Sequence, residues 1–199
     1  MWPALRSNFN SPYRGPMDTL LIIDMQVKGF ENSKQYDDTN TINRINLLSE
    51  KFRDRNGSVI FIQHDGTAEQ GYEPNSPGWE ILPSLIKLDT DTVINKTICD
   101  SFYKTTLQEV LTTTNSNRLY ITGSASDFCV DTTIRSAVSK DHNVIVVSDC
   151  HTTKDRPHLN AKSIIEHHNY VWNDLITAQG SIKVMNLESV LQSFVETAA

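Results

Sequence analysis

The sequence predicts a three-layer α/β/α fold around a mainly parallel, six-stranded sheet. Short apolar runs alternate along the chain with segments in which apolar residues recur every three or four positions. The runs are continuous, which is typical of strands that are buried on both faces of a parallel sheet. Alternating strands and helices with right-handed crossovers place helices on both faces of such a sheet.

The first half of the chain accounts for three strands, one long helix and one long loop. The apolar runs predict strands at 19–24, 58–63 and 92–95. The apolar spacing predicts a helix over 38–53, and Asn56-Gly57 is typical of a helix C-terminus. Residues 65–80 are rich in Gly, Pro and Asn and predict a loop, and loops of this length are often functional.

The second half continues the same alternation. We expect strands at 118–122, 143–148 and 182–185 and helices at 103–114, 127–140, 157–168 and 187–196. Residues 18–199 are therefore expected to form one domain of ordinary size, preceded by an extended N-terminal arm at 1–17.

Composition limits the class of function. The 199 residues carry a net charge of −6 and no cluster of Lys and Arg, so we expect no nucleic-acid surface. No apolar stretch approaches the roughly 18–20 residues that span a bilayer, so we expect no membrane insertion. Three widely spaced cysteines make no disulfide framework, which favours a reducing, cytoplasmic location.

Three reactive side chains lie at the ends of predicted strands. Asp24 ends the first strand, Lys96 follows the third and Cys129 follows the fourth. The carboxyl ends of parallel strands meet at one edge of the sheet, so we expect these side chains to converge there. Each alone has an ordinary explanation, as a turn cap, a solvated lysine or a small buried cysteine. Together they predict a catalytic site.

The segment 123–129, GSASDFC, lies where a predicted strand turns into a helix. The first backbone N–H groups of a helix have no intrahelical partner and carry partial positive charge. A thiol at this position is expected to ionise more readily than a free thiol, whose pKa is about 8.5. We do not expect Cys99 or Cys150 to be nucleophiles, and the sequence leaves open whether either lies near the site.

Three segments carry a family resemblance: LLIIDMQVKGF, VINKTICDSFYKTTLQEVL and YITGSASDFCVDTTIRSA. In their order and approximate spacing they resemble the signature segments of the isochorismatase-like cysteine hydrolases. That superfamily includes nicotinamidases and carbamoylsarcosine-type amidohydrolases, and the resemblance extends over most of residues 18–195. It implies a hydrolase with a catalytic triad of Asp24, Lys96 and Cys129.

The resemblance also implies a role for each of these residues. Cys129 attacks a carbonyl carbon, Asp24 transfers the proton from the thiol to the leaving amine, and Lys96 favours the thiolate. A thioester acyl-enzyme forms and is hydrolysed, so that an amide or carbamoyl C–N bond is cleaved. The backbone N–H groups of Ala125 and Cys129 form the oxyanion hole, next to a cis peptide bond between Ser124 and Ala125.

The pocket and cofactor are less well defined. Candidate pocket residues, each of which could instead be packing or capping the chain, are Gln26, Phe30, His64, Trp79 and Phe102. Metal-binding nicotinamidases carry an Asp two positions before a strand-end His, and another His before the lysine. His64 lacks this Asp, and no His lies between 65 and 95, so we expect neither a metal nor another cofactor.

Two alternative functions stay open beside the amidohydrolase. One is isochorismatase-type hydrolysis of a vinyl ether, and the other is a non-catalytic binding or assembly protein that keeps the fold. An acidic substrate needs arginines in the pocket, and neither Arg118 nor Arg135 lies at the active edge of the predicted sheet. The resemblance also implies a small-molecule substrate, of unknown identity, and a homo-oligomer that is a dimer or larger.

Overall fold

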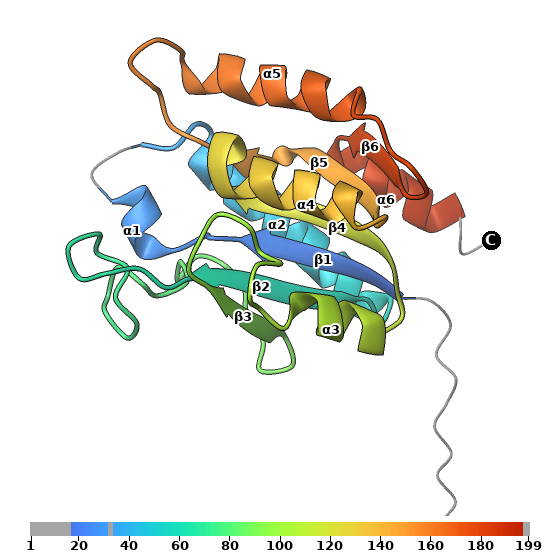
Figure 1. The fold of residues 1–199 in the computed structure, drawn as a ribbon, viewed down its shortest axis with the longest axis horizontal. Helices are drawn as coiled ribbons and strands as arrows, with labels where there is room; N and C mark the ends of the chain where they lie inside the picture. The colour runs from blue at the N-terminus through green and yellow to red at the C-terminus, as the bar shows by residue number, and fades with distance from the viewer. Residues whose placement is uncertain (1–16, 32–33, 197–199) are drawn as a thin grey trace, which may run out of the picture.

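All six strands form a single parallel sheet in the order β3-β2-β1-β4-β5-β6 (Figure 1). The computed structural model describes residues 17–31 and 34–196. The strands are β1 (Met17–Ile23), β2 (Ser58–His64), β3 (Thr92–Lys96), β4 (Ser116–Ser124), β5 (Asn143–Thr152) and β6 (Ser181–Met185). The predicted fold class and its six-stranded parallel sheet are confirmed.

Helices cover both faces of the sheet. They are α1 (Val27–Phe30), α2 (Asp38–Asp54), α3 (Leu107–Thr113), the π-helical turn η1 (Ser126–Val130), α4 (Asp131–Ser139), α5 (Ala161–Asn173) and α6 (Leu187–Glu196). In Figure 1, α2 and α6 lie behind the sheet and α4 lies in front of it. The first core cluster packs β1 against α2 and α6, and the second packs it against α3, α4 and α5.

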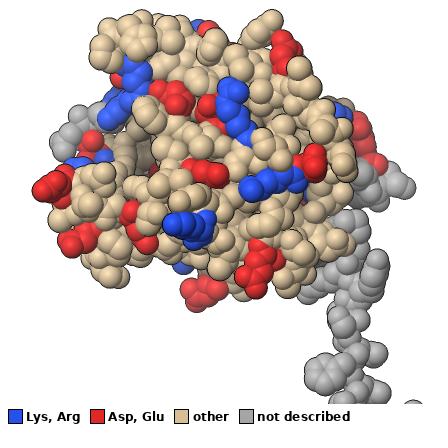
Figure 2. All heavy atoms as spheres, in the orientation of Figure 1, with Lys and Arg blue, Asp and Glu red and all other residues tan. Residues whose placement is uncertain are grey.

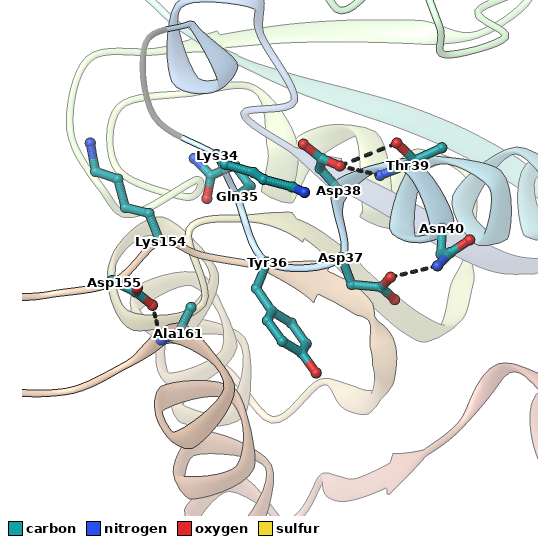
Figure 3. A pocket seen from close by; sticks show the side chains of 10 residues that line it. All are labelled: Lys34, Gln35, Tyr36, Asp37, Asp38, Thr39, Asn40, Lys154, Asp155 and Ala161. Carbon is teal, nitrogen blue, oxygen red and sulfur yellow. Dashed lines mark hydrogen bonds between the residues drawn. The ribbon is translucent and has the colours of Figure 1, made fainter.

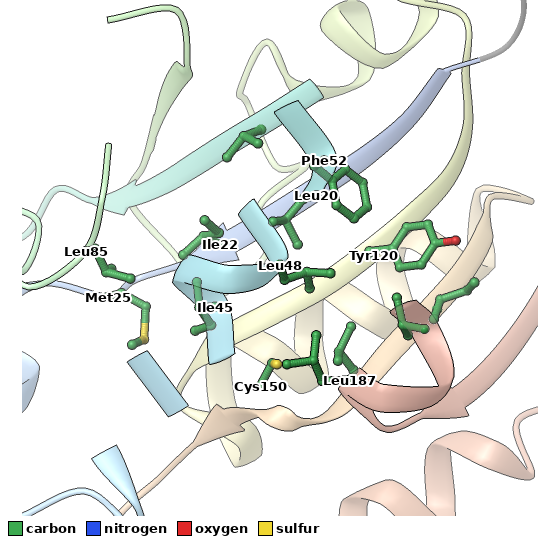
Figure 4. Packing of buried hydrophobic residues seen from close by; sticks show 14 of the residues in the cluster. Leu20, Ile22, Met25, Ile45, Leu48, Phe52, Leu85, Tyr120, Cys150 and Leu187 are labelled. Carbon is green, nitrogen blue, oxygen red and sulfur yellow. The ribbon is translucent and has the colours of Figure 1, made fainter. Parts of the chain in front are cut away.

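The alternation of side chains along β1 explains its continuous apolar run. Leu20 and Ile22 belong to the first cluster, where they pack with Ile45 and other residues of α2 (Figure 4). Leu21 and Ile23 belong to the second cluster, on the opposite face. Because successive side chains of a strand point to opposite faces, a strand buried on both sides places consecutive apolar residues in the core.

Several element boundaries differ from the prediction. The helix expected from 103 begins at Leu107, because the Thr105 hydroxyl donates to the Ser101 carbonyl in a turn before it. The helix expected over 157–168 runs over 161–173, because the Asn160 side chain accepts from the Ser163 N–H and caps it. Met17, assigned to the arm, is the first residue of β1, and residues 1–16 lie outside the described part of the chain.

Strand order reverses beside β1, which places the ends of several strands together. Ile23, the last residue of β1, is in register with Ile62 of β2 on one side and with Gly123 of β4 on the other. Gly123 has a φ of 121°, and a Cβ atom at this position would collide with the backbone of Ile23. Only glycine fits there, so β1 and β4 approach closely where sites form in open parallel sheets.

Acidic and basic side chains are interspersed on the face seen in Figure 2, without a large area of one sign. Among the residues that the structure describes, no helix is long and apolar enough to cross a membrane.

Candidate active site

Asp24 is the first residue after β1, and its backbone turns into the left-handed region with a φ of 48°. Aspartate tolerates this conformation better than most residues. Its backbone N–H donates to the Ile62 carbonyl at 2.9 Å, which ties the turn to the neighbouring strand β2. Oδ1 of the carboxylate is buried and has no hydrogen-bond partner in the described part of the chain.

Lys96, the last residue of β3, connects the other two members of the predicted triad. Its Nζ lies 2.7 Å from Oδ2 of Asp24 and 3.3 Å from Sγ of Cys129. The third hydrogen of the ammonium is donated to the Ile98 carbonyl at 3.0 Å. An ammonium group has three hydrogens, so these contacts use all of its donors. The structure therefore brings Asp24, Lys96 and Cys129 together from distant parts of the sequence.

Cys129 lies in η1, which connects β4 to α4, so it lies at a strand-to-helix turn as the sequence predicts. Burial raises the pKa of its thiol, and the nearby Asp24 carboxylate raises it further, while Lys96 opposes both effects. The expectation of an easily ionised thiol is therefore wrong. A helix N-terminus favours the thiolate, but desolvation and a neighbouring anion outweigh it here.

The turn before Cys129 is closed by the carbonyl of Ala125. This oxygen accepts from the backbone N–H groups of Phe128 at 3.0 Å and Val130 at 3.2 Å. The peptide bond between Ser124 and Ala125 is cis. Ala125 and Cys129, the two residues expected to supply oxyanion donors, thus belong to one compact turn at the end of β4.

Comparison with known proteins identifies the family to which this site belongs. The sequence model of the isochorismatase domain family matches residues 18–179. The chain belongs to the isochorismatase family. The resemblance seen in the three signature segments is thereby confirmed.

The chain is similar to several known proteins and solved structures. A streptothricin hydrolase from Streptomyces noursei is 32% identical over 145 residues, which are 71% of this chain and 57% of that protein. The uncharacterized family protein YddQ of Bacillus subtilis is 36% identical over 140 residues, 67% of this chain and 77% of YddQ. A solved isochorismatase family structure has a TM-score of 0.75 and 31% identity, covering 83% of this chain and 97% of that one. The chain thus spans little more than half of the streptothricin hydrolase.

Gln26, a predicted pocket residue of this isochorismatase-family chain, is fully buried and bound to backbone groups. Its Nε2 donates to the carbonyls of His64 at 3.0 Å and Trp79 at 2.8 Å, and its Oε1 accepts from the His64 N–H at 2.9 Å. No polar group of Gln26 is left for a substrate. Its structural role is to join the two ends of the loop at 65–80.

His64, the last residue of β2, lies in register with Lys96 on β3 and does reach the site. Its Nδ1 is buried and has no hydrogen-bond partner among the residues described. Burial lowers the pKa of the imidazole, and the charge of Lys96 lowers it further. The ring is therefore neutral at neutral pH and has one nitrogen available to a bound molecule.

The predicted aromatic residues have different positions. Trp79 is half-buried, and its Nε1 donates to Oδ1 of Asp65 at 2.7 Å, which fixes it at the base of the loop. Phe30 packs on the first core cluster. Phe102 is buried in the second core cluster and stacks on His142, with ring centroids 5.5 Å apart. Phe102 is therefore part of the core.

Sequence reasoning missed Tyr72, in the middle of the long loop. Its ring packs edge-on against His64, with centroids 5.5 Å apart. Burial, then the nearby Asp24 and Cys129, raise the pKa of its hydroxyl to about 12. The hydroxyl therefore belongs to the same site and keeps its proton at neutral pH. The only signal in the sequence was an aromatic residue inside a loop already expected to be functional.

The other two cysteines have different relations to the site. Cys99 is partly buried and close enough to contribute to the raised pKa of Cys129. Cys150 is fully buried in the first core cluster, and burial raises the pKa of its thiol.

A groove also opens between the segment 34–40 and the start of α5 (Figure 3). Its lining includes Lys34 and Lys154 together with Asp37, Asp38 and Asp155, so side chains of both charges line it. None of the predicted site residues lines this groove.

Proposed function

We propose that this isochorismatase-family hydrolase cleaves the C–N bond of a small, uncharged amide or carbamoyl compound, with Cys129 as nucleophile. The observation that carries this proposal is the position of Lys96, whose ammonium contacts both Asp24 and Cys129. A thiol, a carboxylate and a cation in mutual contact are the groups needed for nucleophilic attack on a carbonyl with proton transfer.

The proposed reaction has two halves. Asp24 takes the proton of Cys129 as sulfur bonds to the carbonyl carbon, and the backbone N–H groups of Ala125 and Cys129 bind the oxyanion. The C–N bond then breaks, Asp24 returns the proton to the leaving nitrogen, and a thioester remains. Asp24 next takes a proton from water, hydroxide adds to the thioester, and the acid leaves as the proton returns to sulfur. One oxyanion donor is typically worth about 10²–10³ in rate.

The protonation states support this order of events. Because its pKa is raised, Cys129 begins as a neutral thiol, so a base must take its proton during attack. Oδ2 of Asp24 is occupied by Lys96, whereas Oδ1 is buried and unpartnered, so Oδ1 is the proposed base. Lys96 offsets the single negative charge of this pair, which is on the Asp24 carboxylate before the transfer and on sulfur as the proton leaves.

Two groups of the pocket wall are proposed to bind the substrate. His64 has a buried Nδ1 without a partner among the described residues, and the ring of Tyr72, whose hydroxyl is neutral, packs against His64. A leaving or acyl group with its own hydrogen-bonding atoms would satisfy both. This favours a polar but uncharged substrate.

Charge favours an amide over the vinyl ether of isochorismate. All three donors of Lys96 are used within the protein, so it has none for a substrate carboxylate. The arginines of the described chain are likewise engaged, each with a carboxylate or a carbonyl; they are Arg44, Arg53, Arg55, Arg118, Arg135 and Arg156. Among the described residues, an acidic substrate would therefore meet no guanidinium that lacks a partner within the protein.

We also propose that the protein acts in a reducing compartment such as the cytoplasm, because a nucleophilic thiol is lost on oxidation.

A screen for released ammonia or amine tests the proposal. Small amides and carbamoyl compounds form one set, streptothricin is added because a relative is named for it, and isochorismate is the competing substrate. The expected result is hydrolysis of a neutral compound by the wild type and none by Cys129→Ala. Mass spectrometry should find the acyl group as a thioester on Cys129. Turnover that survives in Cys129→Ala, or cleavage of isochorismate alone, would overturn the proposal.

A further inference from the structure

A buried histidine lies beside the turn that carries Cys129, and the proposed reaction does not use it. His151 of β5 is 2% exposed and lies in register with Gly123. Its Nδ1 is 2.7 Å from the hydroxyl of Ser126, the first residue of η1, and its Nε2 is 3.0 Å from Oδ1 of Asn169 on α5. The imidazole therefore joins the nucleophile-bearing turn to helix α5.

The hydrogen positions in this chain of contacts follow from Asn169. Its Nδ2 donates to the Ser148 carbonyl at 3.0 Å, because the opposite orientation would place two oxygens against each other. Oδ1 of Asn169 is then an acceptor, so Nε2 of His151 carries hydrogen. Burial, with a further contribution from His168 that the Asn169 contact and Asp149 oppose, lowers the pKa of His151 to about 4. The ring is neutral, Nδ1 accepts, and the Ser126 hydroxyl donates.

The imidazole of His151 is also connected, through Trp172, to the C-terminal end of η1. Its ring packs edge-on against Trp172 of α5, with centroids 5.2 Å apart. Nε1 of Trp172 donates to Oδ1 of Asp131 at 2.7 Å, and Asp131 is the first residue of α4. Ser126 and Asp131 thus hold the two ends of η1, and Cys129 lies between them.

We propose that His151 is a positioning residue. With its hydrogen on Nε2, it accepts a hydrogen bond from the Ser126 hydroxyl at Nδ1, and this contact fixes the orientation of Cys129 and of the oxyanion donors. The inference rests on the proposed function, since it concerns the orientation of Cys129 as the nucleophile. A displacement of about 1 Å in a reacting group can cost about 10²-fold in rate, so a fixed turn matters for kcat.

Nuclear magnetic resonance tests the hydrogen positions in the unaltered protein, without any substrate. Two-bond proton–nitrogen correlation spectra of protein with isotope-labelled histidine distinguish the two tautomers of each ring. The His151 resonances, assigned with His151→Asn, should report hydrogen on Nε2 and none on Nδ1 from about pH 6 to 9. Hydrogen on Nδ1, or titration of this ring within that range, would overturn the proposal.

Two substitutions separate the two ends of the imidazole. His151→Asn places an amide oxygen near the position of Nδ1 and keeps an acceptor for Ser126, whereas His151→Gln places its amide near Nε2 and loses that acceptor. Each variant loses one hydrogen bond, so a purely structural role predicts similar effects of both on Tm and on kcat. We expect similar Tm values but a kcat for His151→Gln at least about tenfold below that of His151→Asn, with KM nearly unchanged.

Ser126→Ala removes the donor and should reproduce the kcat of His151→Gln. Equal kcat values for the Asn and Gln variants, or loss confined to KM, would overturn the positioning role. Failure of the proposed function itself is recognised separately, because Cys129→Ala would then keep its activity. In that case the tautomer of His151 measured in the unaltered protein still tests the proposed hydrogen positions, because that measurement needs no activity.

Discussion

The ammonium group of Lys96 lies 2.7 Å from Oδ2 of Asp24, although the two residues are 72 positions apart in the chain. The Lys96 side chain is 0% exposed and that of Asp24 is 11% exposed. Burial alone would lower the pKa of Lys96, but the Asp24 carboxylate, by its charge and by its hydrogen bond, raises it above its ordinary value. Lys96 therefore stays charged, and the site combines a cation, a carboxylate and a neutral thiol.

Breaking this ion pair should destabilise the fold as well as remove activity. Lys96→Met leaves the carboxylate of Asp24 unpaired in a buried site, and we expect it to lower the free energy of unfolding by about 3–5 kcal/mol. Arg118→Met is the matched control, since Arg118 and Asp18 are also 2.7 Å apart but 33% and 17% exposed. It should cost only about 0–1 kcal/mol. Urea unfolding measures both, and equal losses would contradict a special cost of burial.

Removing the charge of Asp24 should separate the reactivity of the thiol from turnover. A free thiol has a pKa of about 8.5. Because the pKa of Cys129 is raised, the rate at which iodoacetamide labels Cys129 in the wild type should keep rising above about pH 8.5. Because Asp24 contributes to the raised pKa of Cys129, Asp24→Asn should lower that pKa and speed labelling at pH 7. Hydrolysis should fall by about 10²–10⁴ because the base is lost.

Peptide mass spectrometry identifies the labelled cysteine in this experiment. Cys150 is fully buried and should stay unlabelled while the protein is folded. Asp18→Asn, a substitution outside the site, should label like the wild type. Slower labelling of Cys129 in Asp24→Asn would show that the carboxylate does not control its ionisation.

Tyr72→Phe removes one hydroxyl and leaves the ring against His64 in place. If the hydroxyl binds substrate, kcat/KM should fall about tenfold, the worth of one hydrogen bond of about 1.4 kcal/mol. Because the pKa of Tyr72 is raised to about 12, its proton is retained as the pH passes 10, so its ionisation should not lower the activity there. Tyr103→Phe, at a residue 47% exposed, is the control and should match the wild type.

Gln26→Leu tests the fastening of the long loop. It removes the side-chain partner of the His64 carbonyl and N–H and one of the two side-chain donors to the Trp79 carbonyl, and we expect a loss of about 2–4 kcal/mol in stability. Gln63→Leu is the control, because Gln63 makes a single contact to the Trp79 carbonyl. Chymotrypsin should cleave the loop at Tyr72 faster in Gln26→Leu than in Gln63→Leu. Equal cleavage would mean that other contacts hold the loop.

The sheet could be predicted because its strands carry their own signal. The run 20–23 is apolar throughout and is buried on both faces, and it forms the centre of β1. The boundary of β5 could not be predicted in the same way. This strand continues through polar residues to Thr152, and His151 and Thr152 are buried because tertiary hydrogen bonds satisfy them. Such partners are distant in sequence, so periodicity does not reveal them.

The reactive residues were predictable from their positions at strand ends, but their environment was not. Cys129 follows β4 as expected, whereas its pKa depends on burial and on Asp24, which follows a different strand, β1. Gln26 and Phe102 have the residue types of a pocket. Only the contacts with His64, Trp79 and His142 assign them to the framework and the core.

The contacts by which Gln26 holds the loop have a consequence for the choice of substrate in this chain. Its amide joins His64 to Trp79, so the residues between them form a unit closed at its base. The attacking groups lie on strand ends and in η1, outside that unit, whereas Tyr72 lies inside it. If Tyr72 binds substrate as proposed, exchange of residues 66–78 as one segment is expected to change the substrate preference and to leave the contacts among Asp24, Lys96 and Cys129 in place.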